Sequence, residues 1–355
     1  MKILLIGAIH QNHPPEGGEE FKNQLLVRFF RAHFSRCEVI DTKYWRTQPK
    51  VWIRLFVHLF LVSYDRIIIS ASSASTYRLL QIVYYLSRRK LSKIVYMVIG
   101  GYFPEAVTAK IYRRKFYADL FQIIVEGHYL KDELKKSALE SNVSVIPNFK
   151  AIEATFIPAK VVGIEKEKTK FVFLSRIAPS KGVPEIFEAV ALLRQLKNLP
   201  AFSIDFYGPV EAPFQSSFFS LIGEYADCCT YKGYLDLVGK TEQSYQTLAE
   251  YHCMLFPTYW QGEGFPGVVV DAYIAGLPII GSDWNMNSEI IEEGKTGYLI
   301  EPKSSEQLAT AMKKIILDPE TLKILRKNSL QKAKAYDYRD VLTNHLLPLI
   351  KTETL

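Results

Sequence analysis

The chain has 355 residues, of which 48% are hydrophobic and 23% charged, with a net charge of +7. This length exceeds one typical domain, and this composition excludes an intrinsically disordered chain. The four cysteines show no C-x-x-C spacing and no paired histidines, which excludes an obvious metal site and favours a reduced, cytosolic protein. The longest apolar run, residues 51–62, contains Arg54 and His58 and is too short to span a bilayer, so we predict no transmembrane helix.

Short apolar strands alternate with helical stretches along the whole chain. The first strand is expected at residues 2–9, because this run has no cleavage site and so does not read as a signal peptide. The other strands are expected at residues 66–71, 93–100, 121–126, 143–148, 170–175, 202–208, 253–258 and 277–282. This alternation predicts α/β architecture with doubly wound parallel sheets. Because such sheets bind ligands at the carboxyl ends of their strands, the loops there should carry the chemistry.

One polar stretch, residues 146–170, interrupts this alternation. It holds two prolines and the charge run EKEKTK, a composition that is typical of a linker. We therefore expect an N-terminal Rossmann-like domain over residues 1–150, a linker over residues 151–168, and a second such domain over residues 169–335. The tail, residues 336–355, reads as an amphipathic helix that packs back on the N-terminal domain.

Positive charge is concentrated in the first half of the chain. Residues 1–150 carry 23 basic and 12 acidic side chains, and residues 46–115 alone carry 13 basic and 2 acidic ones. These cations lie between aromatic and aliphatic residues, a pattern that indicates contact with an anionic membrane surface. An ordinary solvated basic face is the alternative. Binding of nucleic acid is a weaker alternative, because the sequence contains no recognition motif, and we predict no nucleic-acid partner.

A loop with two cations follows the first strand of the second half. The strand should end at Ser175, and a helix should start with Pro184 in its first turn. Arg176 and Lys181 lie between them. Together with free backbone N–H groups, they would suit a diphosphate, because arginine binds it bidentately and lysine as a point charge. Two solvated loop charges remain the alternative.

A single carboxylate stands in the apolar segment EGFPGVVVDAYIAGLPIIGSDW. A helix should begin near Phe265 and Pro266, which places Asp271 on its second turn among valines, where an ionised carboxylate needs partners. Glu263 lies in the loop before this helix. Both carboxylates could accept hydrogen bonds from the hydroxyls of a sugar or ribose. Alternatively, Asp271 pairs with a lysine or a helix N-terminus.

These motifs, in this order, resemble the retaining nucleotide-sugar glycosyltransferases of the GT-B fold, whose signature is E-x7-E followed by A-x-x-x-G-x-P-V-I. The resemblance rests on the segments SRIAPSKG, YGPV, YKGYLD, FPTYWQGEGFPGVVVDAYIAGLPIIGSD and EEGKTGYLIEP. It is specific over residues 171–302. In the first half, PPEGGEEFKNQLLVRFFR looks like the glycine loop and first helix of the family, and VSVIPN like its exit strand. The resemblance implies two Rossmann-like domains that face each other across a cleft.

The resemblance also implies a donor site. Arg176 and Lys181 would hold the donor diphosphate and Glu263 would face the donor sugar, and these three would be the catalytic residues. Asp271 would bind the nucleotide ribose, whose hydroxyls would explain why the carboxylate is buried. Further donor contacts would come from Gly17, Gly18, Phe265, Pro266 and Gly267.

Three positions depart from the family pattern. Asp271 is one methylene shorter than the second glutamate of the signature, and Ser175 replaces a usual glycine. The histidine that often ends a central strand of the first domain is missing, and Gly100 and Gly101 stand there instead. Polar residues near neighbouring strand ends could take its place: Glu105, Glu126 and His128.

The resemblance therefore implies transfer of a sugar from a nucleotide diphosphate sugar, with a UDP-sugar favoured, to a glycan or lipid-linked acceptor. Retention of configuration and a role in cell-surface polysaccharide biosynthesis are expected, at the cytoplasmic face of a membrane. No D-x-D-like pair lies in a suitable loop, so we expect metal independence and no cofactor. The alternatives are a non-catalytic partner subunit and a UDP-sugar epimerase on the same scaffold.

Overall fold

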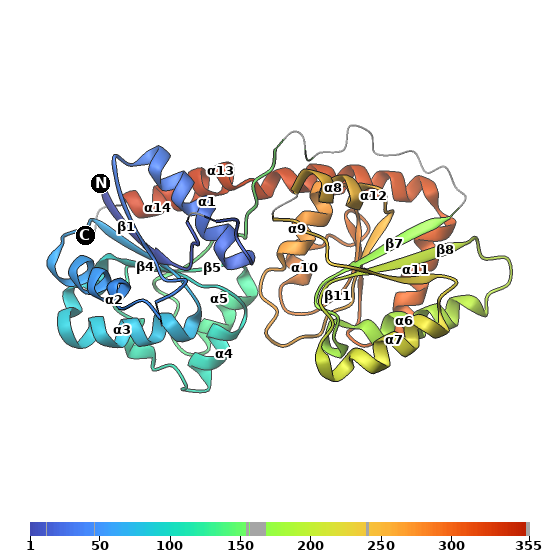
Figure 1. The fold of residues 1–355 in the computed structure, drawn as a ribbon, viewed down its shortest axis with the longest axis horizontal. Helices are drawn as coiled ribbons and strands as arrows, with labels where there is room; N and C mark the ends of the chain where they lie inside the picture. Colours follow the sequence, from blue (N-terminus) through green and yellow to red (C-terminus); the bar gives the residue numbers. More distant parts are fainter. Residues whose placement is uncertain (12, 46, 154–155, 157–167, 239–240, 353–355) are drawn as a thin grey trace. The chain divides into compact units, whose positions relative to one another are not determined.

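The chain forms two compact units, each built on a parallel β-sheet with helices on both faces (Figure 1). The computed structural model describes residues 1–11, 13–45, 47–153, 156, 168–238 and 241–352. Unit 1 comprises Met1–Ala151, Gly262–Phe265 and Tyr336–Leu355. Unit 2 comprises Ile152–Gln261 and Pro266–Ala335. Most of the predicted linker, residues 154–155 and 157–167, lies outside the described residues.

The sheet of unit 1 has the strand order β2-β1-β3-β4-β5-β6, and all neighbouring strands are parallel. Its strands are β1 (Lys2–Gly7), β2 (Arg36–Asp41), β3 (Arg66–Ser70), β4 (Ile94–Met97), β5 (Gln122–Val125) and β6 (Val143–Val145). The order of the strands reverses between β1 and β3. In a sheet of this topology, that reversal leaves a crevice for ligands at the carboxyl ends of these two strands.

The helices of unit 1 cover both faces of its sheet. They are α1 (Gly18–His33), α2 (Pro49–Phe56), η1 (Val57–Leu61), α3 (Ser73–Ser87), η2 (Arg88–Lys93), α4 (Tyr102–Thr108), η3 (Arg114–Phe116), α5 (His128–Lys135), α13 (Tyr338–Val341), η8 (Leu342–Leu346) and α14 (Leu347–Lys351). Leu26 and Phe30 of α1 share a buried core with Leu342, Leu346 and Ile350 of the tail. The last helices of the chain therefore complete the core of unit 1. The tail was expected as one helix, but the π-helical segment η8 divides it.

The sheet of unit 2 has the order β12-β11-β10-β7-β8-β9, again with all neighbours parallel. Its strands are β7 (Thr169–Leu174), β8 (Phe202–Tyr207), β9 (Cys229–Gly233), β10 (Cys253–Phe256), β11 (Ile279–Ser282) and β12 (Gly297–Ile300). The order reverses between β7 and β10, as in a Rossmann sheet. The loops that follow these two strands are therefore where a ligand is expected.

Helices also cover both faces of the unit 2 sheet. They are η5 (Pro179–Lys181), α6 (Val183–Arg194), η6 (Ala212–Phe214), α7 (Gln215–Glu224), α8 (Thr241–Ala249), α9 (Gly267–Ile274), α10 (Asn287–Ile290), α11 (Ser305–Leu317) and α12 (Pro319–Ala333), followed by η7 (Lys334–Tyr336). Helices α6, α7 and α11 lie on one face, and α8, α9 and α12 on the other (Figure 1). Among the described residues, no helix is both long and apolar enough to cross a membrane.

The predicted strands are present, and the predicted class of doubly wound parallel sheets is confirmed. Three strands were missed: β2, β9 and β12. All three lie at sheet edges, and their side chains are only partly buried. An edge strand has one exposed side, so its sequence lacks the continuous apolar run of a central parallel strand. For this reason the segments YKGYLD and EEGKTGYLIEP read as loops although each contributes to a strand.

Candidate functional site

In unit 2, the loops after β7 and β10 lie against each other at the carboxyl edge of the sheet. The amide of Tyr259 donates to the carbonyl oxygen of Ser180 at 2.9 Å. Gly182 has a φ of +76°, and a Cβ atom added there would lie 2.1 Å from the carbonyl oxygen of Pro257. Only glycine fits this backbone conformation and this close approach. Gly182 therefore lets the loop after β7 rest on the loop after β10 at the place where α6 begins.

The two cations predicted for this site lie over the same indole ring. The guanidinium carbon of Arg176 is 5.2 Å from the centre of the Trp260 ring, and Nζ of Lys181 is 4.4 Å from it. Arg176 is partly exposed and also forms an ion pair of 3.0 Å with Glu211, whereas Lys181 is only 5% exposed. Two positive charges gathered at one aromatic face repel each other, and a bound anion would relieve that repulsion. The sequence had not singled out Trp260.

The loop after β8 lines the same edge from the other side of β7. The amide of Ile177 donates to the carbonyl oxygen of Pro209 at 2.8 Å, and the amide of Glu211 donates to the carbonyl oxygen of Ile177 at 3.0 Å. Gly208 has a φ of +135°, and a Cβ atom there would lie 1.9 Å from the carbonyl oxygen of Ser175. Backbone contacts thus fix the position of the loop that holds Arg176.

Asp271 has a partner within the chain. It lies on α9, is 2% exposed, and its Oδ1 accepts a hydrogen bond of 2.7 Å from the hydroxyl of Tyr245 on α8. Burial and the neighbouring carboxylate raise the pKa of the Tyr245 phenol, so the phenol stays protonated and donates. The hydroxyl of Tyr245 therefore satisfies part of the hydrogen-bonding capacity of this buried carboxylate, and binding of a ribose to it stays a prediction.

The segment with the other predicted carboxylate, Glu263, belongs to unit 1. The amide of Gly101 lies 3.4 Å from the carbonyl oxygen of Gly262, and a Cβ atom on Gly101 would lie 2.5 Å from the carbonyl oxygen of Glu263. The side chain of Asn148 donates to the carbonyl oxygen of Phe265 at 3.3 Å. The backbone of this loop therefore fills the place where a histidine was expected. A side chain at position 101 would push the loop away, which explains the glycine there.

The remaining predicted contacts occupy the start of α9. Pro266 is the residue before the helix and Gly267 is its first residue, so the free backbone groups of this terminus lie directly after Phe265. Of the candidates for the missing histidine, Glu126 is buried in an ion pair of 2.6 Å with Lys22 on α1. His128 and Glu105 are exposed, at the start of α5 and in α4.

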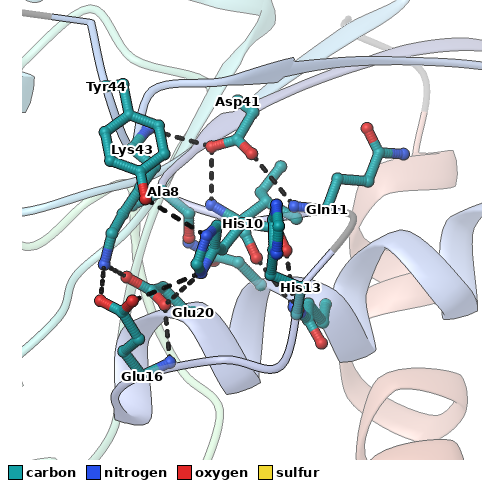
Figure 2. A network of polar contacts seen from close by, with 12 residues as sticks. Ala8, His10, Gln11, His13, Glu16, Glu20, Asp41, Lys43 and Tyr44 are labelled. Carbon is teal, nitrogen blue, oxygen red and sulfur yellow. Dashed lines mark hydrogen bonds and ion pairs between the residues drawn. The ribbon is translucent and has the colours of Figure 1, made fainter.

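A polar network that the sequence did not predict lies between β1 and α1 (Figure 2). Nζ of Lys43 forms ion pairs with Glu16, at 2.8 Å, and with Glu20. These hydrogen bonds raise the pKa of Lys43, and the pKa of Glu16 is lowered. Nδ1 of His10 is 3.7 Å from Glu20, and its Nε2 is 3.3 Å from the hydroxyl of Tyr44.

The network includes three residues whose spacing would suit a metal ion, with the ammonium group of Lys43 beside them. Ligand atoms of His10, Glu16 and Glu20 lie within 4.8 Å of one another, a spacing that a metal ion could use. The ammonium group of Lys43 supplies the positive charge for both carboxylates. Asp41 orders the adjoining loop, because its carboxylate accepts from three backbone amides, at 3.0 to 3.2 Å.

The predicted glycines, Gly17 and Gly18, stand at the N-terminus of α1 beside this network. A Cβ atom on either one would meet no other atom of the described chain within 4 Å, and Gly17 is in extended backbone conformation. Packing within the chain thus does not require glycine at these positions, and their contact with a donor stays a prediction. In the first turn of α1, burial together with Glu20 raises the pKa of Glu19 to about 7.

Comparison with known proteins relates the second half of the chain to a family. Residues 157–332 match the family model for glycosyl transferases group 1. A UDP-N-acetylglucosamine–peptide N-acetylglucosaminyltransferase subunit of Streptococcus pneumoniae is 31% identical over 46% of this chain and 30% of its own length. The UDP-Gal:α-D-GlcNAc-diphosphoundecaprenol α-1,3-galactosyltransferase of Escherichia coli is 23% identical over 69% of this chain and 60% of its own length. The chain thus spans less than two thirds of either relative.

Solved structures share the fold along nearly the whole chain. Anabaena HepE in complex with UDP has a TM-score of 0.74 at 16% identity, covering 99% of this chain and 100% of that one. Sucrose-phosphate synthase from Thermosynechococcus elongatus has a TM-score of 0.75 at 16% identity, covering 97% of both chains. These likenesses confirm the predicted two-domain GT-B fold.

Proposed function

We propose that this chain, which belongs to the group 1 glycosyltransferases, transfers a sugar from a UDP-sugar to a glycan or lipid-linked acceptor with retention of configuration. The observation that carries the proposal is the pair of cations, Arg176 and Lys181, held over Trp260 where the strand order of unit 2 reverses. This is the edge at which a Rossmann sheet binds nucleotides. The segment that matches the family model contains all three residues.

The cations have a defined role in this chemistry. Sugar transfer releases a nucleoside diphosphate, and negative charge grows on its leaving oxygen in the transition state. Lys181 is buried, so its charge acts through a medium of low polarity and stabilises that oxygen more strongly than a solvated lysine would. Arg176 can bind the diphosphate bidentately. We propose that these two side chains do the work of a metal ion, and that transfer needs neither a metal nor a cofactor.

The donor sugar and the nucleoside would be held by carboxylates and backbone. Glu263 would accept hydrogen bonds from sugar hydroxyls, and Asp271 from the ribose, next to the hydroxyl of Tyr245. The backbone of Phe265, Pro266 and Gly267, together with Gly17 and Gly18, would contact the donor. Several related proteins carry UDP in their names or structures, including the Anabaena and Escherichia coli proteins, and this favours uridine as the base.

The acceptor is proposed by analogy with relatives. The Escherichia coli relative acts on a diphosphoundecaprenol-linked sugar, and a Salmonella typhimurium relative, 25% identical over 62% of this chain, is a lipopolysaccharide 1,2-N-acetylglucosaminetransferase. A lipid-linked glycan precursor of a cell-surface polysaccharide fits both. We therefore propose that the protein acts in the cytoplasm, peripherally attached to the membrane.

Thermal unfolding with UDP, GDP, ADP and CMP tests the donor site. A ligand at a hundredfold excess over its Kd stabilises the native state by about 2.7 kcal/mol. We expect UDP to stabilise the wild type, and Arg176→Ala/Lys181→Ala to abolish this shift. Lys313→Ala/Lys323→Ala on α11 and α12 removes two cations elsewhere in unit 2 and is the matched control. A shift by no nucleotide, or one that the double variant retains, would contradict the assignment.

Turnover then separates transfer from its alternatives. The variants are assayed for release of UDP from UDP-sugars with and without a glycan acceptor, and the anomeric configuration of the product is read by NMR. Conversion of the sugar without an acceptor would identify an epimerase. Nucleotide binding without any turnover would identify a partner subunit, and an inverted product would refute retention.

A further inference from the structure

Helix α2 and the π-helix η1 leave large apolar side chains in solvent. Of the eight residues of α2, only Leu55 is buried. Ile53 is 64% exposed, Phe56 is 51% exposed and Leu61 of η1 is 71% exposed. A surface helix normally turns its apolar stripe toward the core. This segment keeps a second apolar stripe outward.

The C-terminal end of α3 adds apolar side chains nearby. Tyr85 and Leu86 are 67% and 64% exposed. The chain continues directly into η2, where Nζ of Lys90 donates to the carbonyl oxygen of Val62 at 3.2 Å. This bond ties the end of α3 to the residue that follows η1. The chain after η1 is therefore held beside the segment that follows α3, and Figure 1 shows α2 and α3 on the same side of the unit 1 sheet.

The surface around these side chains is basic. Residues 46–115 hold 13 basic and 2 acidic side chains. Arg66 is buried, and the other described cations of this range are exposed or half-buried. Arg54 follows Ile53, and Arg88 and Arg89 follow Leu86 after one residue. Cations thus lie next to the exposed apolar side chains in the sequence. Arg54 and Arg88 also form ion pairs, with Glu38 and Asp119, and Arg89 is exposed.

We propose that this basic-apolar face, formed by Ile53, Phe56, Leu61, Tyr85 and Leu86 with their neighbouring cations, docks unit 1 on an anionic phospholipid bilayer. The apolar side chains enter the boundary between headgroups and acyl chains, and the cations pair with lipid phosphates. Charge complementarity favours this occupant, because exposed apolar residues within a cationic surround match anionic lipid and would repel a second copy of the same face. The inference rests on the membrane attachment proposed above and names the surface that makes it, and docking itself requires no turnover.

Vesicle co-sedimentation tests the proposal. The wild type is mixed with vesicles of phosphatidylcholine alone and with vesicles that also contain phosphatidylglycerol. We expect binding only to the anionic vesicles, and weaker binding at high salt. Phe56→Ser/Leu61→Ser should weaken binding about tenfold or more, because two exposed apolar side chains no longer enter the bilayer. Arg89→Ala should weaken it about fivefold.

A matched control lies in unit 2. Leu317 and Ile324 are 50% and 59% exposed, and Leu317→Ser/Ile324→Ser should leave vesicle binding unchanged. All these side chains are exposed, so the melting temperature of each variant should match that of the wild type. Equal loss in both double variants, or binding that ignores lipid charge, would overturn the proposal.

Two further outcomes are decisive. If the wild type binds no vesicles and sedimentation velocity shows a dimer that Phe56→Ser/Leu61→Ser dissociates, a second copy covers the face and the proposal is wrong. Stabilisation by UDP is measured on the same samples. Vesicle binding that fails while UDP still stabilises the protein overturns docking alone and leaves the donor site intact.

Discussion

Asp271 offers the sharpest test of the donor site, because the structure shows Tyr245 donating to its carboxylate and the proposal adds the hydroxyls of a ribose. We consider Asp271→Asn, which keeps the volume of the side chain and an oxygen that can accept from Tyr245 but removes the charge. The carboxylate is 2% exposed, so hydrogen bonds that a ribose donates to it are shielded from water. Hydrogen bonds to charged groups contribute about 1.5–3 kcal/mol. The variant should therefore bind UDP about tenfold to 150-fold more weakly.

The assay is calorimetric titration with UDP and with 2′,3′-dideoxy-UDP. If Asp271 accepts from the ribose hydroxyls, the wild type should lose affinity for the dideoxy compound, and Asp271→Asn should bind both compounds alike. The coupling free energy from this cycle should then exceed about 1.5 kcal/mol. Tyr245→Phe is the control: it removes the donor to Oδ1 and should cost about 1–3 kcal/mol of stability while the ribose coupling persists. A coupling within about 0.5 kcal/mol of zero would refute a role in ribose binding and leave Asp271 a structural residue.

Three other predictions concern the framework of the site. Gly182→Ala should cost more than about 2 kcal/mol in chemical unfolding, because φ is +76° and the added methyl meets backbone at 2.1 Å, whereas Gly223→Ala in α7, where the space is open, should be neutral or stabilising. Glu126→Gln should lower the free energy of unfolding by about 3–5 kcal/mol, because it leaves Lys22 buried without its charge partner. The double variant Lys22→Met/Glu126→Leu should recover most of this loss, and equal stability of the two variants would contradict the prediction. Burial and nearby cations lower the pKa of His252 to about 4, so between pH 6.5 and 4 the unfolded chain binds a proton at this residue that the folded chain does not bind. The free energy of unfolding, measured in urea titrations, should therefore fall by up to about 3 kcal/mol as the pH is lowered through this window. His252→Gln should flatten the dependence of this free energy on pH.

The sequence predicts the interior of the fold better than its margins. Central parallel strands such as β7 and β10 are buried on both faces, so their sequences are continuous apolar runs that can be located without a structure. β2, β9 and β12 are half-exposed at sheet edges, and their mixed sequences resemble loops. Their assignment depends on pairing with a neighbour far away in the chain.

The residues of the candidate site also fall into two groups: those that a single segment of sequence identifies, and those that matter only through contact with a distant segment. Arg176, Lys181 and Asp271 could be selected because each breaks the pattern of its own segment. Trp260 and Tyr245 could not, since an aromatic residue in an apolar segment looks like ordinary core. Their roles arise only when the fold brings separate elements together.

The loops at the carboxyl ends of the strands are fixed by two kinds of contact, which differ in how readily they can be recognised in a sequence. In unit 2, glycine-backbone contacts at Gly182 and Gly208 set the loops, with carbonyl oxygens about 2 Å from any added Cβ. Few sequences satisfy such contacts, so the loops carry a recognisable motif. In unit 1, ion pairs and hydrogen bonds of Asp41, Lys43 and Glu20 set the loop after β1. Many combinations of polar side chains can serve that purpose, so this part of the framework is harder to recognise in a sequence than a position where only glycine fits.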